Sequence, residues 1–494
     1  MRVIVGRMLG VLVALAIAGV LLGHAHVFGV KRSAASVVIA LLAAGVVATG
    51  MARRIGTVRE LLELPSVVFS LVLIVYLANG RTLWSGDTVP ARYLPISLLV
   101  ERNFDLDEFP FLYTNGTEYC PRGCEREGRP PYFLQMVGGH YVSAYPVGAA
   151  LLALPFYLLP VLSGLDPQSP FVEELEKLSA ATIVAASAVM VYLTLRRLTL
   201  SWAVGAFITA IYAFGTSSWS VSSQALWQHG PSQLSLAAML YCLVRTSEGG
   251  WWLTAAGFCA AATVVFRPPD AVIILPFVVY VLVRHRSGVV TFLLGGVPVV
   301  AFQAWYNLTV FGNAVHSQFP LPGIGVREWS GHFTAGFFGI LLSPGRGLLL
   351  YSPIWLMALV RGALSWRKGE NGLLRAATVG VVLSILLYSK WYWWWGGYTY
   401  GPRVLADLSP LLALMLSQLG LDLLRSRELA VVAVVLGAWS IGAHAIGAFG
   451  DVESWNSAVE VSRFPDRVWW LRNNQPVNVI RQLYYDVVRL ARGG

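Results

Sequence analysis

The chain of 494 residues has a mean hydropathy of +0.62, with 18 tryptophans and only 13% charged residues. This composition excludes a soluble multidomain protein and is typical of a polytopic membrane protein. The formal net charge of +10 does not indicate nucleic-acid binding, because the Lys and Arg residues stand in ones and twos between apolar segments. Such a spread is typical of a topology signal.

Residues 1–22 resemble a signal peptide, with Arg2 and Arg7 before an apolar run. The small-residue cleavage pattern is poor and a second apolar segment follows at once, so we expect a retained first helix. Apolar runs along the whole chain predict about 13 membrane-spanning helices. They lie near residues 3–22, 34–51, 66–84, 179–198, 201–219, 229–246, 251–266, 268–284, 288–310, 337–361, 371–389, 404–424 and 428–449.

The segment 145–162 is also apolar enough to span, and the charges that follow it decide against this. If it crossed the membrane, the basic groups of every later loop would face outward, which reverses the positive-inside bias. We therefore predict a re-entrant or interfacial element, held at the outer face by its prolines. The region 85–178 then forms one long outer-face loop, and the tail 450–494 also lies outside.

The stretch 251–284 is too long for one span, since a single helix would measure about 51 Å against a hydrocarbon core of roughly 30 Å. Two short helices that meet at Arg267-Pro268-Pro269-Asp270 fit better, because proline can start a helix but not continue one.

Asp87 follows the third apolar run, in Leu83-Trp84-Ser85-Gly86-Asp87-Thr88. An ionised carboxylate at a membrane boundary is a functional-site candidate, because it is unfavourable there unless something uses or solvates it. The alternative is an interfacial Asp that caps the next helix, which Thr88-Val89-Pro90 would suit.

Under this topology the unusual polar groups collect at the outer face. They are Asp87, Arg92, Tyr93, His229, Arg267, Asp270, Arg346 and the segment from Lys390 to Arg403, which contains Trp391, Trp394, Tyr398 and Tyr400. Aromatic rings stack on sugars and basic groups hold phosphate, so the segment suggests a lipid-phosphate-sugar site. The alternatives are an interfacial aromatic belt for the tryptophans, snorkelling for Arg346 and a helix-end hydrogen bond for His229.

Two further clusters lie in the long loop. Asp105, Asp107 and Glu108 resemble a metal-binding triplet, with a solvated acidic face as the alternative, and we expect no metal or other cofactor. Cys120 and Cys124 are close enough for a small disulfide loop in an oxidising compartment, whereas a zinc site would need a second ligand pair nearby.

The order of these features resembles the GT-C glycosyltransferases. A long first outer loop opens with an acidic residue just past a helix, followed by Arg92-Tyr93, an interfacial helix and a proline-led element at Tyr145-Pro146. Members of this family, such as protein O-mannosyltransferases and aminoarabinose transferases, are integral-membrane enzymes that use polyprenyl-phosphate sugars. The resemblance covers approximately residues 66–425 and implies an all-α membrane fold.

The resemblance carries the family's catalytic carboxylate onto Asp87, its basic-aromatic pair onto Arg92-Tyr93 and its basic-proline junction onto Arg267-Pro268. The chain departs from the family in three places. The spacing from Asp87 to Arg92 is longer, Thr88 stands where a second acid is common, and residues 144–148 lack the lysine of the aminoarabinose transferases.

We expect four parts: two helices in 1–65, a catalytic transmembrane module in 66–425, a last helix in 426–449 and the tail 450–494. The resemblance implies an inverting enzyme of the plasma membrane whose active site faces the outside or periplasm. It would move a sugar from a polyprenyl-phosphate donor to a hydroxyl of a glycan, lipid or protein acceptor, with Asp87 as general base.

The expected site residues fall into three groups. The donor phosphate is assigned to Arg403, Arg346, Arg92, Arg267 and Lys390, the sugar or acceptor to Tyr93, His229, Trp391, Trp394, Tyr398 and Tyr400, and a second acid to Asp105, Asp107 or Asp270. A transporter or flippase of lipid-linked sugars would use similar groups, but with polar residues at mid-bilayer or along both faces. A non-catalytic scaffold, with Asp87 as a helix cap, is the third possibility.

Overall fold

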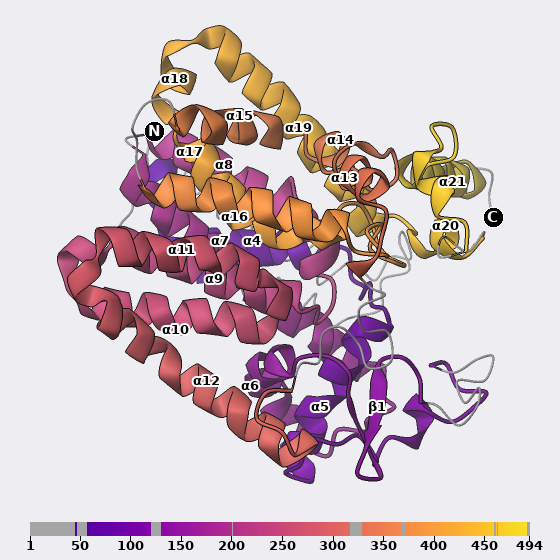
Figure 1. Cartoon of the computed structure of the whole chain (residues 1–494). Helices are drawn as coiled ribbons and strands as arrows, with labels where there is room; N and C mark the ends of the chain where they lie inside the picture. The colour runs from indigo at the N-terminus through magenta and orange to yellow at the C-terminus, as the bar shows by residue number, and fades with distance from the viewer. Residues whose placement is uncertain are drawn as a thin grey trace.

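The computed structural model describes residues 45–46, 57–119, 130–199, 201–316, 329–366, 372–458, 461 and 463–491, and these are mostly helical (Figure 1). The predicted span 3–22, most of 34–51 and the Cys120–Cys124 pair lie outside the described residues. Four described helical segments are long and apolar enough to cross a membrane: Phe171–Leu198 (α7), Arg286–Phe311 (α12 with its preceding turn), Gly372–Ser389 (α16) and Arg427–Phe449 (α19). The count of about 13 spans stays a prediction.

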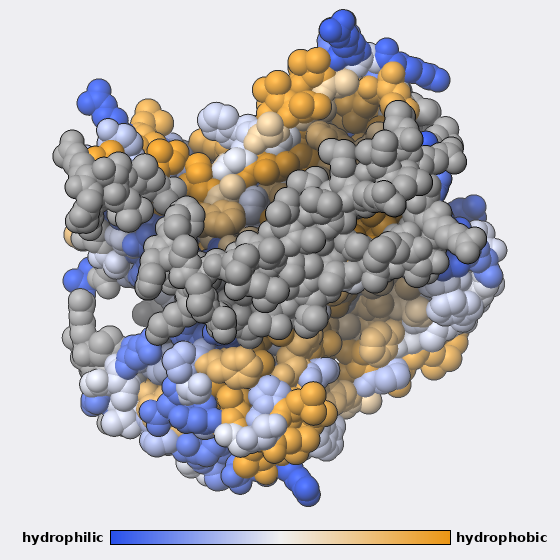
Figure 2. Space-filling model, turned by 180° about the vertical axis from the view of Figure 1, so that it is seen from behind, coloured by the Kyte–Doolittle hydropathy of each residue, from blue (hydrophilic) through white to orange (hydrophobic). Residues whose placement is uncertain are grey.

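Apolar side chains are exposed on these helices. Val290 and Leu294 of α12 and Val434 and Trp439 of α19 are more than half exposed. Figure 2 shows hydrophobic side chains over much of one face, with hydrophilic ones gathered toward its edges. A surface of this kind is favourable against lipid rather than water, which agrees with a membrane protein.

Helix α7 begins at Phe171, well before the predicted start at residue 179. Its first turns contain Glu173 and Glu176, which the sequence places in a loop because they interrupt the apolar run. Arg92 forms an ion pair with each of these carboxylates, and negative charge suits a helix N-terminus. Tertiary pairing therefore extends the helix beyond its apolar part.

Most other helices are shorter than a span. They are α4 (Pro65–Leu77), α5 (Val89–Val100), α6 (Gly148–Leu162), α8 (Trp202–Phe214), α9 (His229–Val244), α10 (Trp251–Phe266), α11 (Ala271–Arg284), α13 (Phe333–Leu342), α15 (Trp355–Ser365) and α17 (Ser409–Ser417). The predicted break is confirmed, since α10 ends at Phe266 and the short turn Pro268–Asp270 leads into α11. Helix α6 measures about 22 Å, which is as short as predicted spans such as α4 and α8, so its re-entrant placement stays a prediction.

Two predicted helices are broken. The run 337–361 contains α13, α14 (Leu348–Tyr351) and α15, with interruptions around Pro344 and Pro353, because proline lacks the N–H that an interior helical turn needs. The run 404–424 contains the 3₁₀ turn Arg403–Leu408, α17 and α18 (Gly420–Arg425). Continuous apolarity in these runs therefore does not mean one helix.

The long loop contains a β-hairpin that we did not expect in an all-α fold. Strand β1 (Leu134–Val137) pairs antiparallel with β2 (His140–Ser143) through Gly138 and Gly139, whose φ angles are 61° and 94°. A Gly-Gly pair between two short runs is a hairpin signal, because glycine adopts positive φ without strain.

The bundle brings distant segments to one end. Helix α9 packs against α7 and α10, and α10 packs against α12. In Figure 1 the group of α5 and β1 lies at the right-hand end of these helices, and so do α20 (Glu453–Ala458) and α21 (Gln475–Ala491). The candidate site lies at this end.

Candidate functional site

Asp87 lies in a 3₁₀ turn, Gly86–Thr88, directly before α5. One carboxylate oxygen accepts hydrogen bonds from the hydroxyls of Tyr145 (2.8 Å) and Tyr132 (3.2 Å). The other accepts from Nη1 of Arg403 at 2.5 Å. The side chains of Asp87 and Arg403 are 20% and 11% exposed, so the ion pair is largely shielded from solvent but not sealed.

The helix-cap interpretation of Asp87 is wrong. The residue at the cap position of α5 is Thr88, without a side-chain cap hydrogen bond, and Ser85 caps the 3₁₀ turn by accepting from the N–H of Asp87. Both carboxylate oxygens of Asp87 point to side chains from other parts of the chain.

The surroundings of Asp87 favour its ionised form. Burial raises the pKa of Asp87, but the charge of Arg403 and the hydrogen bonds from Arg403, Tyr145 and Tyr132 outweigh it, so the pKa lies below its usual value. While Arg403 is attached, Asp87 is a charged and weakly basic acceptor.

Arg403 opens the 3₁₀ turn Arg403–Leu408 after the tryptophan-rich segment. Its guanidinium lies 4.7 Å from the centre of the Trp227 ring, as in a cation–π contact. Its Nε is buried and has no hydrogen-bond partner among the described residues. Arg403 therefore has a donor left for a ligand oxygen.

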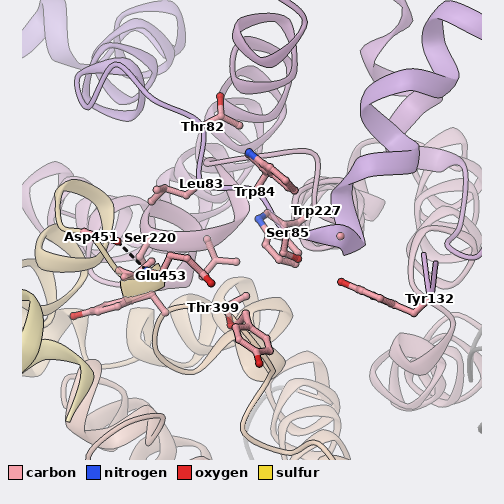
Figure 3. Close-up of a pocket in the computed structure, with 15 residues that line it drawn as sticks. Thr82, Leu83, Trp84, Ser85, Tyr132, Ser220, Trp227, Thr399, Asp451 and Glu453 are labelled. Atoms are coloured by element: carbon pink, nitrogen blue, oxygen red, sulfur yellow. Dashed lines mark hydrogen bonds between the residues drawn. The ribbon is translucent and has the colours of Figure 1, made fainter. Parts of the chain in front are cut away.

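A cavity of about 480 Å³ lies close to the Asp87–Arg403 pair (Figure 3). Neither residue lines it, but Tyr132 and Trp227, which contact Asp87 and Arg403 respectively, do. Tyr132, which donates to Asp87, enters it from one side, while Thr399 and Glu453 lie on the other. The volume is in the range of small-molecule sites. Its lining is rich in aromatic and hydroxyl groups: Thr82, Leu83, Trp84, Ser85, Gly86, Tyr132, Ser220, Val221, Trp227, Tyr398, Thr399, Tyr400, Asp451, Val452 and Glu453.

The predicted aromatic residues divide between this cavity and the core. Tyr398 and Tyr400 line the cavity, whereas Trp391 and Trp394 are buried against the helix bundle. Lys390 is exposed and is not part of the lining. The two tryptophans therefore form neither a membrane belt nor a sugar platform in this structure.

Arg267, His229 and Asp270 form a buried cluster around Asp407, close enough to the Asp87–Arg403 pair for the charges of that pair to act on it. Nη1 of Arg267 lies 2.6 Å from Asp407 and 3.1 Å from Asp270, and Nδ1 of His229 lies 2.9 Å from Asp407. Ser232 donates to Asp270 at 2.5 Å. One cation, Arg267, is shared by the two carboxylates, and none of these residues lines the cavity. The phosphate, acceptor and acid roles expected for Arg267, His229 and Asp270 stay predictions.

Arg92 is also already paired. Its side chain is fully buried, with Nε 2.6 Å from Glu176 and Nη1 3.0 Å from Glu173. The neighbouring Tyr93 shares a hydrogen bond of 2.8 Å with Tyr119. Neither Arg92 nor Tyr93 lines the cavity, although the guanidinium of Arg92 lies 4.8 Å from the centre of the Trp84 ring, which does. The structure shows the ion pairs of Arg92, and its role toward phosphate stays a prediction.

Arg346 lies in the break between α13 and α14, buried and away from the cavity lining. It donates to the carbonyl oxygens of Trp395 (2.7 Å), Gly345 (3.0 Å) and Gly397 (3.2 Å). It also donates to the side-chain oxygens of Asn456 (2.9 Å) and Gln475. Arg346 therefore does not snorkel to the membrane surface. Its donors are already bound by protein acceptors rather than left for a phosphate.

The acidic cluster of the loop contains His140 in place of Glu108. Asp105, Asp107 and His140 offer ligand atoms that all lie within 4.8 Å of one another, so a divalent cation would fit there. Nδ1 of His140 lies 2.7 Å from Asp107, a contact that an ordinary ion pair also explains. None of the three residues lines the cavity.

Sequence reasoning missed several residues of the site. Tyr132 and Tyr145 hold Asp87, Trp84 and Trp227 form walls, and Asp451 and Glu453 complete the lining. Trp84 and Trp227 carried a signal, since each stands within three residues of a polar group already singled out. The sequence gives no such signal for Asp451 and Glu453, because their position at the cavity depends on how the segment after α19 folds.

Neither protein-family models nor curated protein sequences match this chain. Its chemistry must therefore be judged from the site itself.

Proposed function

We propose that the protein is an inverting glycosyltransferase, which moves a sugar from a polyprenyl-phosphate donor to a hydroxyl acceptor. The observation that supports it most is the Asp87–Arg403 pair beside an aromatic-lined cavity, at the mouth of a bundle of apolar helices. The transfer needs a cation that binds the phosphate, a carboxylate that accepts the proton and aromatic side chains that pack against the sugar.

In the proposed mechanism the donor phosphate competes with Asp87 for Arg403. Phosphate oxygens accept hydrogen bonds from the guanidinium, including its unpartnered Nε, and so weaken its contact with Asp87. The pKa of Asp87 then rises, because the charge that lowered it is shared. Substrate binding thereby makes Asp87 a stronger base at the moment of reaction.

Transfer then proceeds in one displacement. Asp87 accepts the proton of the acceptor hydroxyl while that oxygen attacks the anomeric carbon from the face opposite the leaving group. The bond from the anomeric carbon to the phosphate oxygen breaks, and polyprenyl phosphate leaves with the electron pair. Arg403 stabilises the growing charge on the phosphate.

The proposal is tested by Asp87→Asn and by Arg403→Met in purified protein, with a panel of polyprenyl-phosphate sugars. We expect Asp87→Asn to bind donor normally and to lose turnover, measured as release of polyprenyl phosphate. Arg403→Met should weaken donor binding about tenfold or more, as expected for loss of a hydrogen bond to a charged group. Normal turnover in Asp87→Asn would sink the assignment.

A transporter of lipid-linked sugars is the competing function, and the same experiment separates the two. A transporter would bind the panel and move it across a vesicle membrane without releasing polyprenyl phosphate. Release from the wild-type protein, absent in Asp87→Asn, is expected only of an enzyme.

A further inference from the structure

The cavity has a second polar edge, opposite Tyr132, formed by Asp451 and Glu453 at the start of α20. Asp451 is held in place as a cap, because its Oδ1 accepts from the backbone N–H of Glu453 (3.1 Å) and of Ser454 (3.2 Å). Arg81, which donates to the carbonyl oxygen of Gly450, is the cation whose charge acts on Asp451 among the described residues, and it forms no ion pair with it. Asp451 therefore carries negative charge at this edge, and Glu453 adds to it when it is ionised.

A buried donor in the same cavity also lacks a partner. The Trp227 side chain is only 4% exposed, lines the cavity, and its Nε1–H finds no acceptor among the described residues. Leaving a buried N–H without an acceptor is unfavourable, so a ligand oxygen at this position would be stabilising. Trp227 thus points to a ligand independently of the acidic pair.

These groups match the surface of a sugar ring. Aromatic faces such as Trp84 and Tyr398 pack against the C–H faces of a sugar, while carboxylates accept from its hydroxyls and an indole N–H donates to its oxygens. A carboxylate on the sugar would instead be repelled by Asp451 and by ionised Glu453, because close like charges repel one another when they are shielded from water.

We propose that the acidic edge and Trp227 together form the sugar subsite of the enzyme. This subsite selects neutral or amino sugars over uronic acids. The inference rests on the proposed function and names its substrate class. Glu453 accepts hydrogen bonds from ring hydroxyls or from an ammonium group, while the Asp87–Arg403 side of the cavity holds the phosphate.

The titration of Glu453 supports this assignment. Burial against the cavity wall, with the nearby charge of Asp451, raises the pKa of Glu453 to about 7. Its carboxyl can therefore exchange a proton near neutral pH, and a hydroxyl or ammonium donor favours the charged form.

The test measures dissociation constants of the full-length protein in lipid nanodiscs for four probes: polyprenyl phosphate alone and its hexosyl, aminohexosyl and hexuronyl forms. We expect wild type to bind the hexosyl and aminohexosyl lipids at least about tenfold more tightly than the hexuronyl lipid. In Glu453→Gln/Asp451→Asn this preference should fall to about threefold or less, with binding of polyprenyl phosphate unchanged.

The matched control is Glu428→Gln, an exposed glutamate in the first turn of α19, which should keep the wild-type preference. Trp227→Phe removes the N–H without changing charge and keeps a ring beside Arg403, so it should weaken all three sugar lipids about fivefold more than it weakens polyprenyl phosphate. This second variant keeps the proposal testable if the double variant does not fold.

The outcomes separate the two proposals. A wild type that binds hexuronyl and hexosyl lipids equally overturns the sugar subsite alone. A wild type that binds none of the four probes overturns the proposed function and the sugar subsite together. An unchanged preference in the double variant also overturns the subsite.

Discussion

At the residue scale, Asp87 combines two properties that oppose each other in a base. The ion pair with Arg403 and the hydrogen bonds from Tyr145 and Tyr132 fix its carboxylate in one orientation, and they also make it less basic. A catalytic carboxylate gains from the first effect, because orientation lowers the entropic barrier to proton transfer. The second effect is relieved only when a ligand engages Arg403.

Tyr145→Phe removes one hydrogen bond to the charged form of Asp87, so the pKa of Asp87 rises toward its usual value. Activity requires ionised Asp87, and it is present above this pKa and lost as the pH falls through it. We therefore expect the acid limb of kcat/KM to move to higher pH in the variant. Tyr113→Phe, whose hydroxyl donates to the backbone oxygen of Asp107, is the control, and an acid limb that stays in place would contradict the prediction.

At the element scale, the cavity depends on two segments that meet at Arg346. This residue donates to the tryptophan-rich segment at Trp395 and Gly397, and to the tail at Asn456 and Gln475. The first segment leads to Arg403, and the second follows Glu453. Arg346 thus positions both edges of the cavity without touching it.

Arg346→Met leaves buried carbonyl and amide oxygens without donors, and we expect a loss of about 3 kcal/mol or more in stability. The midpoint of thermal unfolding in detergent should fall by several degrees, and KM should rise more than kcat falls. Arg472→Met changes an exposed arginine of the same tail and serves as the control. Equal unfolding midpoints in the two variants would argue against this role.

Helix α19 offers a finer test, because Gly447 lies directly against the ring of Tyr400 in the cavity wall. A Cβ at this position would collide with the ring, so Gly447→Ala must displace Tyr400. We expect donor binding to weaken about tenfold. Gly442→Ala on the same helix meets no atom within 4 Å and should bind donor normally. Similar affinities in both variants would mean that Tyr400 does not shape the site.

At the scale of the whole molecule, α7 separates two charged regions. Its first turns pair Glu173 and Glu176 with Arg92 near the site, whereas its last turn pairs Arg196 with Glu63. A helix of 28 residues measures about 42 Å, against a hydrocarbon core of roughly 30 Å. A crossing by α7 therefore puts the site and the basic end on opposite sides of the membrane.

This topology is tested with single cysteines in a background where the native cysteines are serine. Asp166→Cys lies in the exposed loop before α7, and Asp422→Cys lies near Gly420, which adjoins Thr199 at the far end of α7. The positive-inside bias predicts that an impermeant maleimide labels residue 166 in intact cells and residue 422 only after permeabilisation. Labelling of both under the same condition would overturn the assigned sides.

The sequence by itself determined the features that depend on neighbouring residues. Apolar runs are typical of a membrane protein, Arg267-Pro268 indicates the break between α10 and α11, and Asp87 is conspicuous by its charge at the end of an apolar run. Each of these follows from local chemistry: side-chain transfer free energies, a missing backbone N–H, and the unfavourable placement of a charge near lipid.

Only the tertiary structure decided which charges are available. Asp87 and Arg403 lie 316 residues apart in the chain, and sequence spacing says nothing of their contact. Sequence spacing says equally little about three other cations, because Arg92 and Arg267 form ion pairs with distant carboxylates and Arg346 donates to distant carbonyl oxygens. The role of a buried charge is set by what long-range packing brings against it, since its desolvation must be offset there. Composition and spacing therefore indicate Asp87. The fold decides that Arg403 pairs with it and that Trp227 and Glu453 line the nearby cavity.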